Sequence, residues 1–385
     1  MFKNKIKNII IVAHKFLTQP DDDLVIFLNK KEYDNVLHIR HSFSDAPDRR
    51  SYYTWYKNGE IYEEYRTKDY KKLSEPLIYL KEFYFTLKWV WQSRIKWDRY
   101  IGMDGLCVFF GNFLRLFEKV KHTIYWVIDF VPKGRFKSGL KDKIYHIVNI
   151  YGYKHADEMW DLSPRMAEGR EKFLGIELSD YKLHKVVPQG AWCGRIKRYS
   201  YEECEKNTLV FMGHLLEKQG VHLVVKAIPE IIKKIPNFRF KIIGGGRYKK
   251  SLIQLARDLG VIQYCDFKGK IEDHREVEKE IAKSGLAIAP YIKKLDTWTY
   301  TYYADSGKAK TYLACSVPVL LTDITWNAGE IEKNKCGIII SECQEDIIAK
   351  ITFLMSKNTN QVYRDNAFVY SQRFDYNSIF DRLNI

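Results

Sequence analysis

Apolar runs recur along the first half of the chain, and polar, helix-forming stretches separate them. Several runs are continuously apolar rather than alternating, which is typical of strands covered on both faces. These runs occupy residues 6–13, 33–41, 98–104, 123–131, 156–163 and 183–190. Helices are expected between them, notably at 75–97 and 108–119. This alternation predicts a parallel α/β sheet in the first half.

The second half repeats this plan more clearly. An apolar strand at 208–212 leads to a helix at 219–234. A strand at 238–243 leads to a helix at 247–259, which stops at Gly260. The apolar residues of that helix share one face, as docking on a sheet requires. Four further strands are expected at 265–268, 286–290, 317–321 and 337–341. The second half therefore predicts a second α/β sheet.

A chain of 385 residues exceeds one ordinary hydrophobic core, so about two domains are expected. The first domain is placed at residues 1–190 and the second at 207–359. Residues 191–206 have no clear periodicity and are interpreted as the linker. Residues 360–385 are expected to form a C-terminal helix that packs back on the first domain.

The formal net charge of +15 is spread evenly over the two halves. An even positive field favours anionic partners such as nucleotide diphosphates, phospholipid head groups or nucleic acid. Nucleic acid is not expected as a partner, because no nucleic-acid-binding motif is recognisable. Aromatic residues make up 15% of the chain, which indicates large cores, with sugar-facing or membrane-facing surfaces as the alternative.

The seven cysteines are dispersed without a C-x-x-C pair, which favours reduced thiols in the cytosol over disulfides or a zinc site. The apolar run from Ile9 to Ala13 is too short for a signal peptide. No run of about 18 apolar residues predicts a membrane span. Segment 77–97 mixes aromatic and basic residues, which suits burial against a sheet or, alternatively, a membrane interface. The chain is expected to be cytoplasmic, with peripheral binding to an anionic membrane surface as a further option.

Four segments of the second half follow one another in a specific order. They are VVPQGA (186–191), LVFMGHLLEKQGVHLVVKAI (209–228), FRFKIIGGGRYKKSLIQLARDLGV (238–261) and YADSGKAKTYLACSVPVLLTD (303–323). Their order and spacing, over roughly residues 181–375, resemble GT-B glycosyltransferases of the group-1, family 4-like type. The closing segment resembles the bacterial branch with a D-x-G-K donor loop. The first half resembles this branch in general plan, with HKF at 14–16 and a similar stretch at 124–136.

The resemblance implies an α/β fold of the GT-B class, with two Rossmann-like, doubly wound parallel-sheet domains facing a central cleft. It implies that a nucleotide-diphosphate sugar binds the C-terminal domain and that a glycan or lipid-linked acceptor binds mainly the N-terminal one. Members usually retain the anomeric configuration and need no metal. No cofactor is implied, because the nucleotide sugar is a substrate. The expected enzyme is a hexosyltransferase-like glycosyltransferase of polysaccharide biosynthesis.

Some positions depart from the family pattern. His214 stands where the family has a phosphate-binding arginine. Gln219 stands where it has a lysine, and Lys218, one place earlier, is the donor-binding candidate instead. Thr311 aligns with the acidic residue that commonly binds the nucleotide ribose. These departures keep two alternatives open: a non-catalytic GT-B partner or regulator of another glycosyltransferase, and a sugar-nucleotide epimerase on the same fold.

The turn from Asp305 to Lys308 is the leading candidate for gripping the donor diphosphate. It precedes a helix, whose first N–H groups lack partners and attract anions. Gly307 allows close backbone approach, and Lys308 adds a full positive charge that would stabilise the leaving group as a catalytic residue. Ser306 and Thr311 complete this donor-binding set. The alternative is plain helix capping by Asp305.

Two glycine-bearing turns are further donor-binding candidates. Gly213 and His214 begin the loop after the first strand of the second domain. Gly245 and Gly246 follow the next strand, and Arg247 is placed to replace the missing family arginine. The alternatives are a tight turn, which doubly wound folds often build from glycine, and an ordinary surface histidine.

The first half offers three acceptor-side candidates. Asp129 ends an apolar strand, where it would accept the acceptor proton or hold a sugar hydroxyl; the alternative is a turn cap. His14 and Lys15 end the first strand and are acceptor-binding candidates, although a lone histidine is often structural. The acidic run at 21–23 is interpreted as a helix start rather than as a metal site.

Overall fold

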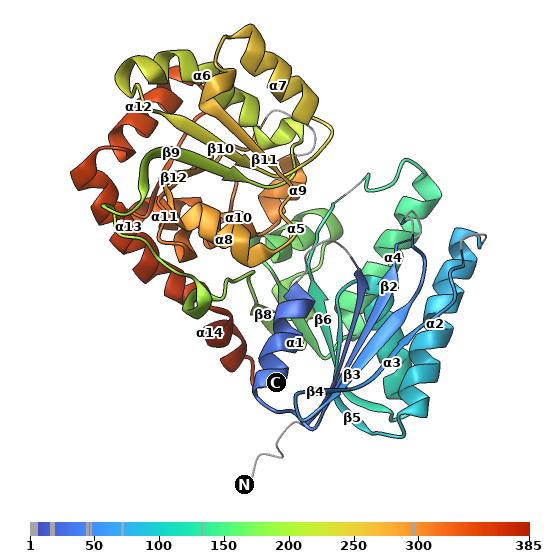
Figure 1. Ribbon diagram of the computed structural model, residues 1–385. Helices are drawn as coiled ribbons and strands as arrows, with labels where there is room; N and C mark the ends of the chain where they lie inside the picture. Colours follow the sequence, from blue (N-terminus) through green and yellow to red (C-terminus); the bar gives the residue numbers. More distant parts are fainter. Residues whose placement is uncertain are drawn as a thin grey trace. The chain divides into compact units, whose positions relative to one another are not determined.

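The structure is a computed structural model. It describes residues 7–15, 20–43, 46, 48–70, 73–132, 134–293 and 298–385, without the side chains of residues 15 and 298–300. The chain divides into two compact units (Figure 1). The first unit holds Met1–Val187 and Phe380–Ile385, and the second unit holds Pro188–Ile379. Each unit is built on its own sheet.

The first unit contains a sheet of eight strands in the order β4-β3-β2-β1-β5-β6-β7-β8. The strands are β1 (Asn8–Lys15), β2 (Asn35–Ser42), β3 (Tyr52–Lys57), β4 (Glu60–Arg66), β5 (Trp97–Gly102), β6 (Val120–Val127), β7 (Glu158–Asp161) and β8 (His184–Val186). The helices are α1 (Pro20–Lys30), α2 (Glu75–Gln92), α3 (Gly105–Leu116), α4 (Gly139–His155), α5 (Pro164–Leu174) and the 3₁₀ turn η1 (Leu178–Asp180). Six of these strands, in the order β2-β1-β5-β6-β7-β8, pair in parallel, as the continuous apolar runs predicted.

An antiparallel hairpin, β3–β4, extends this sheet beyond β2 and was missed by the sequence interpretation. Its turn is Asn58-Gly59, and both residues have positive φ (48° and 84°), as a two-residue hairpin turn of the I′ type requires. An Asn-Gly pair between aromatic-rich segments is a recognised hairpin signal. Strand β4 is exposed along its whole length, so no apolar run marked it.

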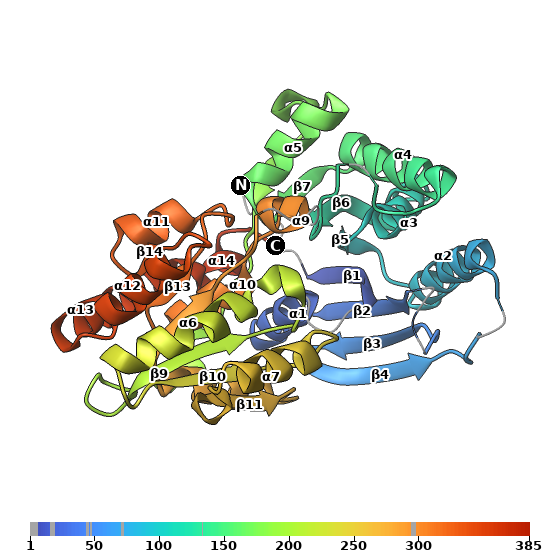
Figure 2. The same ribbon diagram turned by 90° about the horizontal axis from the view of Figure 1, so that it is seen from above.

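Helices α2, α3 and α4 lie along the same side of the first unit's sheet, and α1 lies on the other side (Figure 2). Phe85 and Trp89 of α2 pack with Phe110 and Leu114 of α3 against the central strands. Helix α2 ends at Gln92 rather than continuing to residue 97, because the chain must turn back into β5. Arg94, with φ at 56°, makes that turn.

The second unit contains a fully parallel sheet of six strands in the order β11-β10-β9-β12-β13-β14. The strands are β9 (Glu205–Met212), β10 (Arg239–Ile243), β11 (Cys265–Gly269), β12 (Ser284–Ala289), β13 (Val319–Leu321) and β14 (Gly337–Ile339). The helices are α6 (Val221–Lys234), α7 (Lys249–Asp258), α8 (His274–Ala282), α9 (Trp298–Tyr303), α10 (Gly307–Ala314), α11 (Ala328–Lys333), α12 (Gln344–Leu354) and α13 (Lys357–Ser371). Short 3₁₀ turns are η2 (Cys193–Arg195), η3 (Glu217–Gln219), η4 (Ile262–Tyr264) and η5 (Gln372–Phe374).

Both faces of this second sheet are covered. One hydrophobic cluster joins the sheet to α8, α10, α11 and α13, and another joins it to α6, α7 and α12. Helices on both faces of a parallel sheet define the doubly wound arrangement. The α/β class with two mainly parallel sheets is therefore confirmed, with an antiparallel hairpin at one edge of the first sheet.

The unit boundary differs from the expected linker. The chain passes between units at residues 187 and 188, and segment 191–206 belongs to the second unit. Ala191, Cys193 and Ile196 are buried in that unit's core, so this aperiodic segment is packed structure rather than a tether. Sequence periodicity cannot report such burial, because the segment consists of loops and a 3₁₀ turn up to the start of β9 at Glu205.

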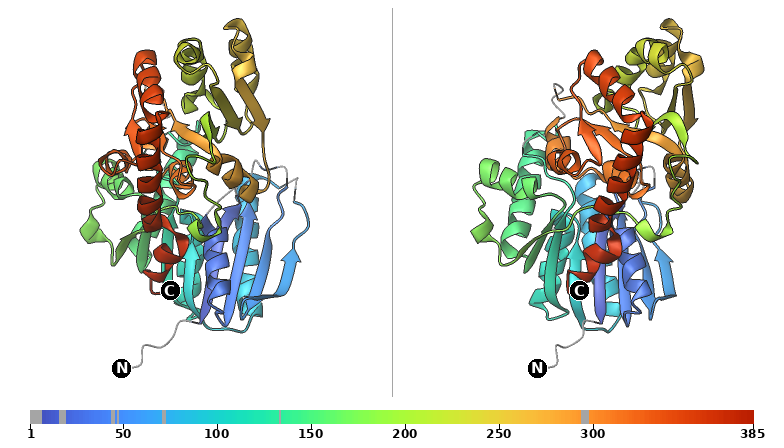
Figure 3. Two further views of the ribbon diagram at one scale, coloured as in Figure 1. Left: turned by 60° about the vertical axis from the view of Figure 1, so that its left-hand side comes forward. Right: turned by 90° about the vertical axis from the view of Figure 1, so that its left-hand side faces the viewer.

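The C-terminal segment is divided between the units. Helix α13 packs within the second unit, where the Arg364 guanidinium donates to the Ser284 and Ala282 carbonyls. Helix α14 (Tyr376–Asp381) follows, and residues from Phe380 onward belong to the first unit (Figure 3). There the Phe380 ring lies 5.3 Å from that of Phe27 and 6.2 Å from that of Trp126.

Candidate functional site

The carboxyl ends of β9, β10 and β12 carry the loops that hold most of the donor-binding candidates. The chain steps outward from β9 to β10 and β11, and then returns to the other side of β9 with β12. Doubly wound sheets bind ligands at such a reversal point. The loops concerned are 213–220 after β9, 244–248 after β10 and 290–293 after β12, together with the turn that begins α10.

Two of these loops cross in close contact, and glycine makes the crossing feasible. Gly244 has φ at 144°, and a Cβ there would lie 1.9 Å from the Gly213 carbonyl oxygen. A Cβ on Gly246 would lie 2.4 Å from the Leu215 carbonyl oxygen. The Leu215 N–H donates to the Gly245 carbonyl at 2.9 Å. Gly244 and Gly246 are therefore required for packing, whereas a Cβ on Gly245 would meet nothing within 4 Å.

Lys308 lies in the second position of α10 with its ammonium held by aromatic rings and a neutral amide. Its Nζ donates to Gln219 Oε1 and lies 4.6 Å from the Phe211 ring centroid and 4.8 Å from that of Tyr291. Among the residues that the structure describes, no carboxylate forms an ion pair with Lys308. Burial and the neighbouring charge of Lys218 lower the pKa of Lys308 to about 7. The positive charge of Lys308 at the reversal point is thus not neutralised by a carboxylate. A buried positive charge of this kind favours the binding of an anion.

Gly213 forms the wall beside that ammonium. It has φ at 141°, and a Cβ there would lie 3.0 Å from Lys308 Nζ. Thus the strand-end glycine of β9 and the donor-turn lysine, which were predicted separately, lie in direct contact. Gln219, which stands where the family has a lysine, is the residue that orients the Lys308 ammonium.

Asp305 points into the protein. Its carboxylate accepts from the Gln189 N–H at 2.6 Å and from Trp326 Nε1 at 2.7 Å, and it forms a buried ion pair with Lys310. A Cβ on Gly307 would lie 2.1 Å from Gln189 Oε1. These contacts give Asp305 the task of anchoring the start of α10 to segment 188–190 and to Trp326. The predicted donor contact of its carboxylate therefore stays a prediction without support from the geometry.

Ser306 and Thr311 are also satisfied by the protein itself. Ser306 occupies the N-cap position of α10 but makes no side-chain cap, and its Oγ lies 3.0 Å from the Tyr291 hydroxyl. The Thr311 hydroxyl donates to the Gly307 carbonyl one helical turn earlier, at 3.1 Å. Neither side chain caps the first N–H groups of α10.

His214 and Arg247 are exposed on the two crossed loops. Neither side chain has a hydrogen bond or ion pair with any residue in the described ranges. Lys218 is half-buried, and its carbonyl accepts from the Ile292 N–H at 3.0 Å, which ties η3 to the loop after β12. Three basic or ionisable side chains thus surround the loops that enclose Lys308.

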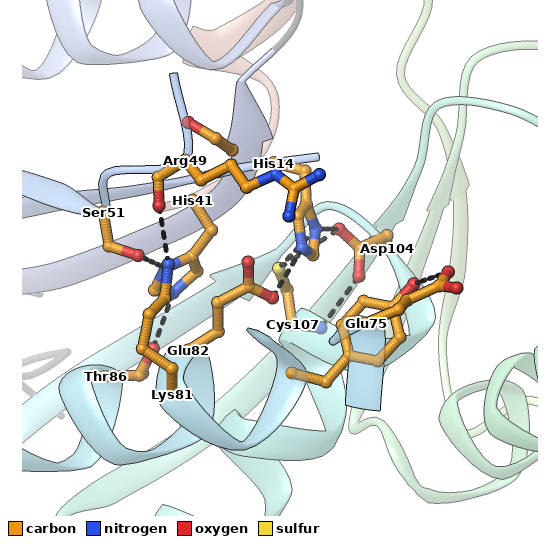
Figure 4. Close-up of polar contacts among 12 residues, drawn as sticks. His14, His41, Arg49, Ser51, Glu75, Lys81, Glu82, Thr86, Asp104 and Cys107 are labelled. Atoms are coloured by element: carbon orange, nitrogen blue, oxygen red, sulfur yellow. Dashed lines mark hydrogen bonds and ion pairs between the residues drawn. The ribbon is translucent and has the colours of Figure 1, made fainter. Parts of the chain in front are cut away.

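A second cluster lies at the carboxyl ends of β1 and β5, which flank the reversal point of the first unit's sheet (Figure 4). His14 is the second-last residue of β1, and its Nδ1 lies 2.6 Å from an Asp104 carboxylate oxygen. Its Nε2 lies 3.0 Å from Glu82 Oε2. Burial lowers the pKa of His14, but the two carboxylates more than reverse this effect and raise the pKa well above 6.5. The two carboxylates therefore favour the protonated, imidazolium form of His14.

The sequence interpretation missed both carboxylate partners of His14. Asp104 follows β5 and caps α3 by accepting from the Cys107 N–H at 2.9 Å, so the spacing of a strand end and a helix N-cap would have identified it. Glu82 is fully buried in the middle of α2, and its Oε1 has no hydrogen-bond partner among the described residues. No local signal identifies Glu82, because its partner is 68 positions away.

His14, Asp104 and Cys107 also offer ligand atoms that lie within 4.8 Å of one another. The His14 Nδ1 to Asp104 Oδ2 distance is 2.6 Å. Ligands of a tetrahedral metal with bonds of about 2.1 Å lie about 3.4 Å apart. The 2.6 Å distance between the two atoms is that of a direct hydrogen bond. Asp21, in the acidic run, hydrogen-bonds His38 at 2.8 Å and lies in the first turn of α1, as the helix-start interpretation predicted.

Asp129 does not join the His14 cluster. Its carboxylate pairs with Arg135 at 2.7 Å, on the loop after β6, and the Arg135 guanidinium lies 5.1 Å from the Tyr145 ring centroid. Asp129 is half-buried. Lys15 continues β1 beyond His14, but its side chain lies outside the described part of the structure.

Replacing Asp104 with asparagine is expected to lower the pKa of His14, because a carboxylate that stabilises the imidazolium is lost. The folded-state pKa of His14 is raised, so its pairing stabilises the first unit below pH 6.5 and ceases to do so as pH rises through the folded pKa. The stability gap between wild type and Asp104→Asn should therefore narrow at high pH. Imidazole NMR titration and urea unfolding at several pH values measure both effects. Glu171→Gln, at an exposed position, is the control; an unchanged His14 pKa in Asp104→Asn would contradict the assignment.

Known proteins resemble the second unit of the chain in sequence. Residues 196–369 match the family model of glycosyl transferases group 1. A GDP-mannose-dependent α-(1-6)-phosphatidylinositol monomannoside mannosyltransferase of Mycolicibacterium smegmatis is 30% identical over 70 residues, which are 18% of each chain. A related enzyme of Corynebacterium glutamicum, named as acting on the monoacylated form, is 26% identical over 145 residues, which are 36% of this chain and 35% of that one. The match to the M. smegmatis relative thus spans less than a fifth of its length.

Solved structures extend the fold match to the whole chain. Sucrose-phosphate synthase from Thermosynechococcus elongatus superposes with a TM-score of 0.71 at 14% identity and 97% coverage of both chains. HepE from Anabaena, solved with UDP and glucose, has a TM-score of 0.68 at 13% identity and 98% coverage of both chains. The chain therefore shares its two-unit fold with these structures, and residues 196–369, which lie within the second unit, are similar to the group 1 glycosyl transferases.

Proposed function

We propose that this chain is a retaining, metal-independent glycosyltransferase that moves a sugar from a nucleotide-diphosphate donor to a glycan or lipid-linked acceptor. The family match over residues 196–369 supports donor use and transfer. We further propose that it works in the cytoplasm, in polysaccharide biosynthesis. The donor half-site lies in the second unit and the acceptor half-site in the first.

The observation that carries the proposal is the desolvated Lys308 ammonium at the β9–β12 reversal point. A departing nucleoside diphosphate gains negative charge as the glycosidic bond breaks, and a preorganised cation in a dry site stabilises that charge strongly. The Gly307 N–H donates to the Asp305 carbonyl at 3.1 Å, and the next N–H groups of α10, which lack an acceptor within the helix, would bind the same phosphates. Lys308, Gly213 and these N–H groups then form one phosphate-binding surface.

The remaining donor contacts are assigned to side chains that are exposed to solvent and to a glycine with open space beside its backbone. His214 and Arg247 are exposed beside Lys308's loops and would supply the charge that the family obtains from its arginine and lysine. Gly245 has free space on its Cβ side, so a ligand could approach its backbone closely. Lys218 adds a second cation near Lys308, as the lowered pKa of Lys308 indicates.

On the acceptor side, Asp104 is the carboxylate that a ligand can reach. Its side chain is 35% exposed, whereas His14 and Glu82 are buried. We assign Asp104 to an acceptor hydroxyl and His14 to holding Asp104 ionised and oriented. Asp129 is retained as the candidate for a sugar hydroxyl or the acceptor proton, with Arg135 keeping its carboxylate in place.

The deciding experiment is a thermal-shift and calorimetric screen of the full chain against UDP- and GDP-sugars, followed by product analysis. Binding, slow hydrolysis without acceptor and transfer with acceptor support the proposal, and activity in EDTA supports the metal-free part. Absence of both binding and hydrolysis would favour a non-catalytic partner. An isomerised sugar formed from donor alone would favour an epimerase.

Donor affinity is expected to depend on pH through Lys308. With a pKa of about 7 in the free protein, Lys308 is charged below that value and increasingly neutral above it. A diphosphate favours the charged form, so the apparent affinity should be constant at low pH and fall up to about tenfold per unit above pH 7. A nucleotide sugar is the suitable probe, because its diphosphate does not titrate in this range. Calorimetry from pH 6 to 9 measures the trend, which should be absent in Lys308→Ala.

A further inference from the structure

Helices α2, α3 and α4 of the first unit present large apolar side chains to solvent. These residues form what we call the apolar face: Leu77, Leu80, Tyr84, Trp91, Phe109, Leu116, Phe117, Leu140, Ile144 and Ile147. Leu116 is 75% exposed, Leu140 is 70% exposed and Leu80 is 62% exposed. Water-facing helix surfaces are normally polar, and a large contiguous apolar patch marks an interaction site.

Helical spacing places these residues in stripes rather than at scattered points. On α2, residues 77, 80, 84 and 91 recur three, four and seven positions apart, which puts them on one side of the helix. On α4, residues 140, 144 and 147 do the same. The opposite side of α2, with Phe85 and Trp89, faces the core. The burial expected for segment 77–97 therefore holds for one face of α2 only.

Ring contacts make the surface continuous across the three helices. Consecutive ring centroids lie 5.1 to 6.2 Å apart along a chain that begins on α2 and ends on α4. The chain consists of Trp91, Phe117, Phe113, Phe83, Phe109 and Tyr151. Three exposed residues of the apolar face, Trp91, Phe109 and Phe117, are therefore joined by one row of rings that reaches α4 at Tyr151. The exposed aliphatic residues of α2 and α4 extend the face along their own helices.

Basic side chains border this surface. Lys88, Lys119, Lys137, Lys143 and Lys154 have no ion pair with any residue that the structure describes. The ammonium of Lys88 lies 5.9 Å from the Tyr84 ring centroid, and that of Lys119 lies 5.9 Å from the Trp91 ring centroid. Helix α3 contains no carboxylate. Carboxylates next to the face are matched by basic partners, since Glu118 pairs with Lys96 and Glu75 with Lys141. The five lysines therefore leave an excess of positive charge around the apolar face.

We infer that the apolar face docks on an anionic lipid bilayer. Leucine, isoleucine and phenylalanine side chains would enter the acyl boundary, Trp91 and Tyr84 would lie at head-group level, and the lysines would bind lipid phosphates. A second copy of this chain suits the surface less well, because each copy carries a net charge of +15 and would bring the same basic border. No helix among the described residues is long and apolar enough to cross a bilayer, so attachment would be at the surface.

The test is co-sedimentation of the full chain with vesicles of phosphatidylcholine alone or with 30% phosphatidylglycerol added, about the anionic content at which basic surfaces bind. Binding is expected with the anionic vesicles at low salt, weakened several-fold at high salt. The double variant Leu116→Ser/Leu140→Ser should bind about tenfold less, since each serine removes apolar area from the membrane contact. Val362→Ser/Val369→Ser, on exposed α13 positions of the second unit, is the matched control and should bind like wild type.

Absence of wild-type binding at low salt overturns the inference, as does equal binding of the two variants. A dimer that the Leu116→Ser/Leu140→Ser variant abolishes, without vesicle binding, would assign the face to self-association instead. Light scattering distinguishes that outcome. Nucleotide-sugar binding should be unchanged in both variants, so failure here is separable from failure of the proposed transferase activity.

Discussion

Replacing Lys308 with alanine is expected to lower donor turnover about a hundredfold, the scale of losing one preorganised electrostatic contact to a transition-state charge. The ammonium has no carboxylate partner within the described residues, so its charge is available to a leaving diphosphate. The variant should fold normally, because the lost Gln219 contact is a single hydrogen bond to a neutral amide. Steady-state kinetics with donor hydrolysis or transfer as the readout measures the effect.

Lys250→Ala is the matched control for that experiment. Lys250 is exposed on α7, in the same unit, and its removal changes the net charge equally. Control turnover should equal wild type within about twofold, because surface charges contribute little. Unchanged turnover in a folded Lys308→Ala protein would remove Lys308 from the mechanism and, with it, the main support for the donor half-site.

Replacing Gly220 with alanine is expected to destabilise the second unit by about 3 to 5 kcal/mol, the range of severe local mutations. Gly220 has φ at 70°, and a Cβ there would lie 1.7 Å from the Pro290 carbonyl oxygen. The loop after β9 and the loop after β12 would have to separate. Because Lys218 and Gln219 precede this glycine, donor affinity should fall as well.

Gly260 provides a close control for that clash. Its φ is 67°, nearly that of Gly220, but a Cβ there would meet nothing within 4 Å. Gly260→Ala should therefore cost only the left-handed backbone strain, about 1 kcal/mol. Hydrogen exchange of the β9 and β12 amides measures the free energy of opening in this unit. Equal costs for the two substitutions would show that the loop after β12 adapts freely.

The strands β9 and β10 and the helices α6 and α7 of the second unit were predictable from the sequence because they are periodic and flanked by glycine. Helix α7 was predicted at 247–259 and lies at Lys249–Asp258, ending before Gly260. The hairpin β3–β4 was not predicted, since β4 is exposed on both faces and carries no apolar run. Its Asn58-Gly59 turn was the available local signal.

The candidate site likewise has residues that the sequence identified and contacts that only the structure revealed. The sequence marked Lys308, Gly213 and the turn at 305–308 as the donor-binding region, and the structure places Lys308 against Gly213. It could not assign Asp305 to a buried pair with Lys310 or give His14 its carboxylate partners. Those assignments depend on which side of a short segment faces the interior.

The sequence by itself determined the two α/β halves, the glycine turns at strand ends and Lys308 at the start of α10, because periodicity and backbone freedom are local properties. Only the tertiary structure decided the chemical state of that lysine and of His14. The pKa of Lys308 depends on burial by Phe211, Tyr291 and Gln219, and that of His14 on Glu82 and Asp104. Such contacts join residues 17 to 97 positions apart along the chain, and their strength follows from distance and desolvation in the folded state.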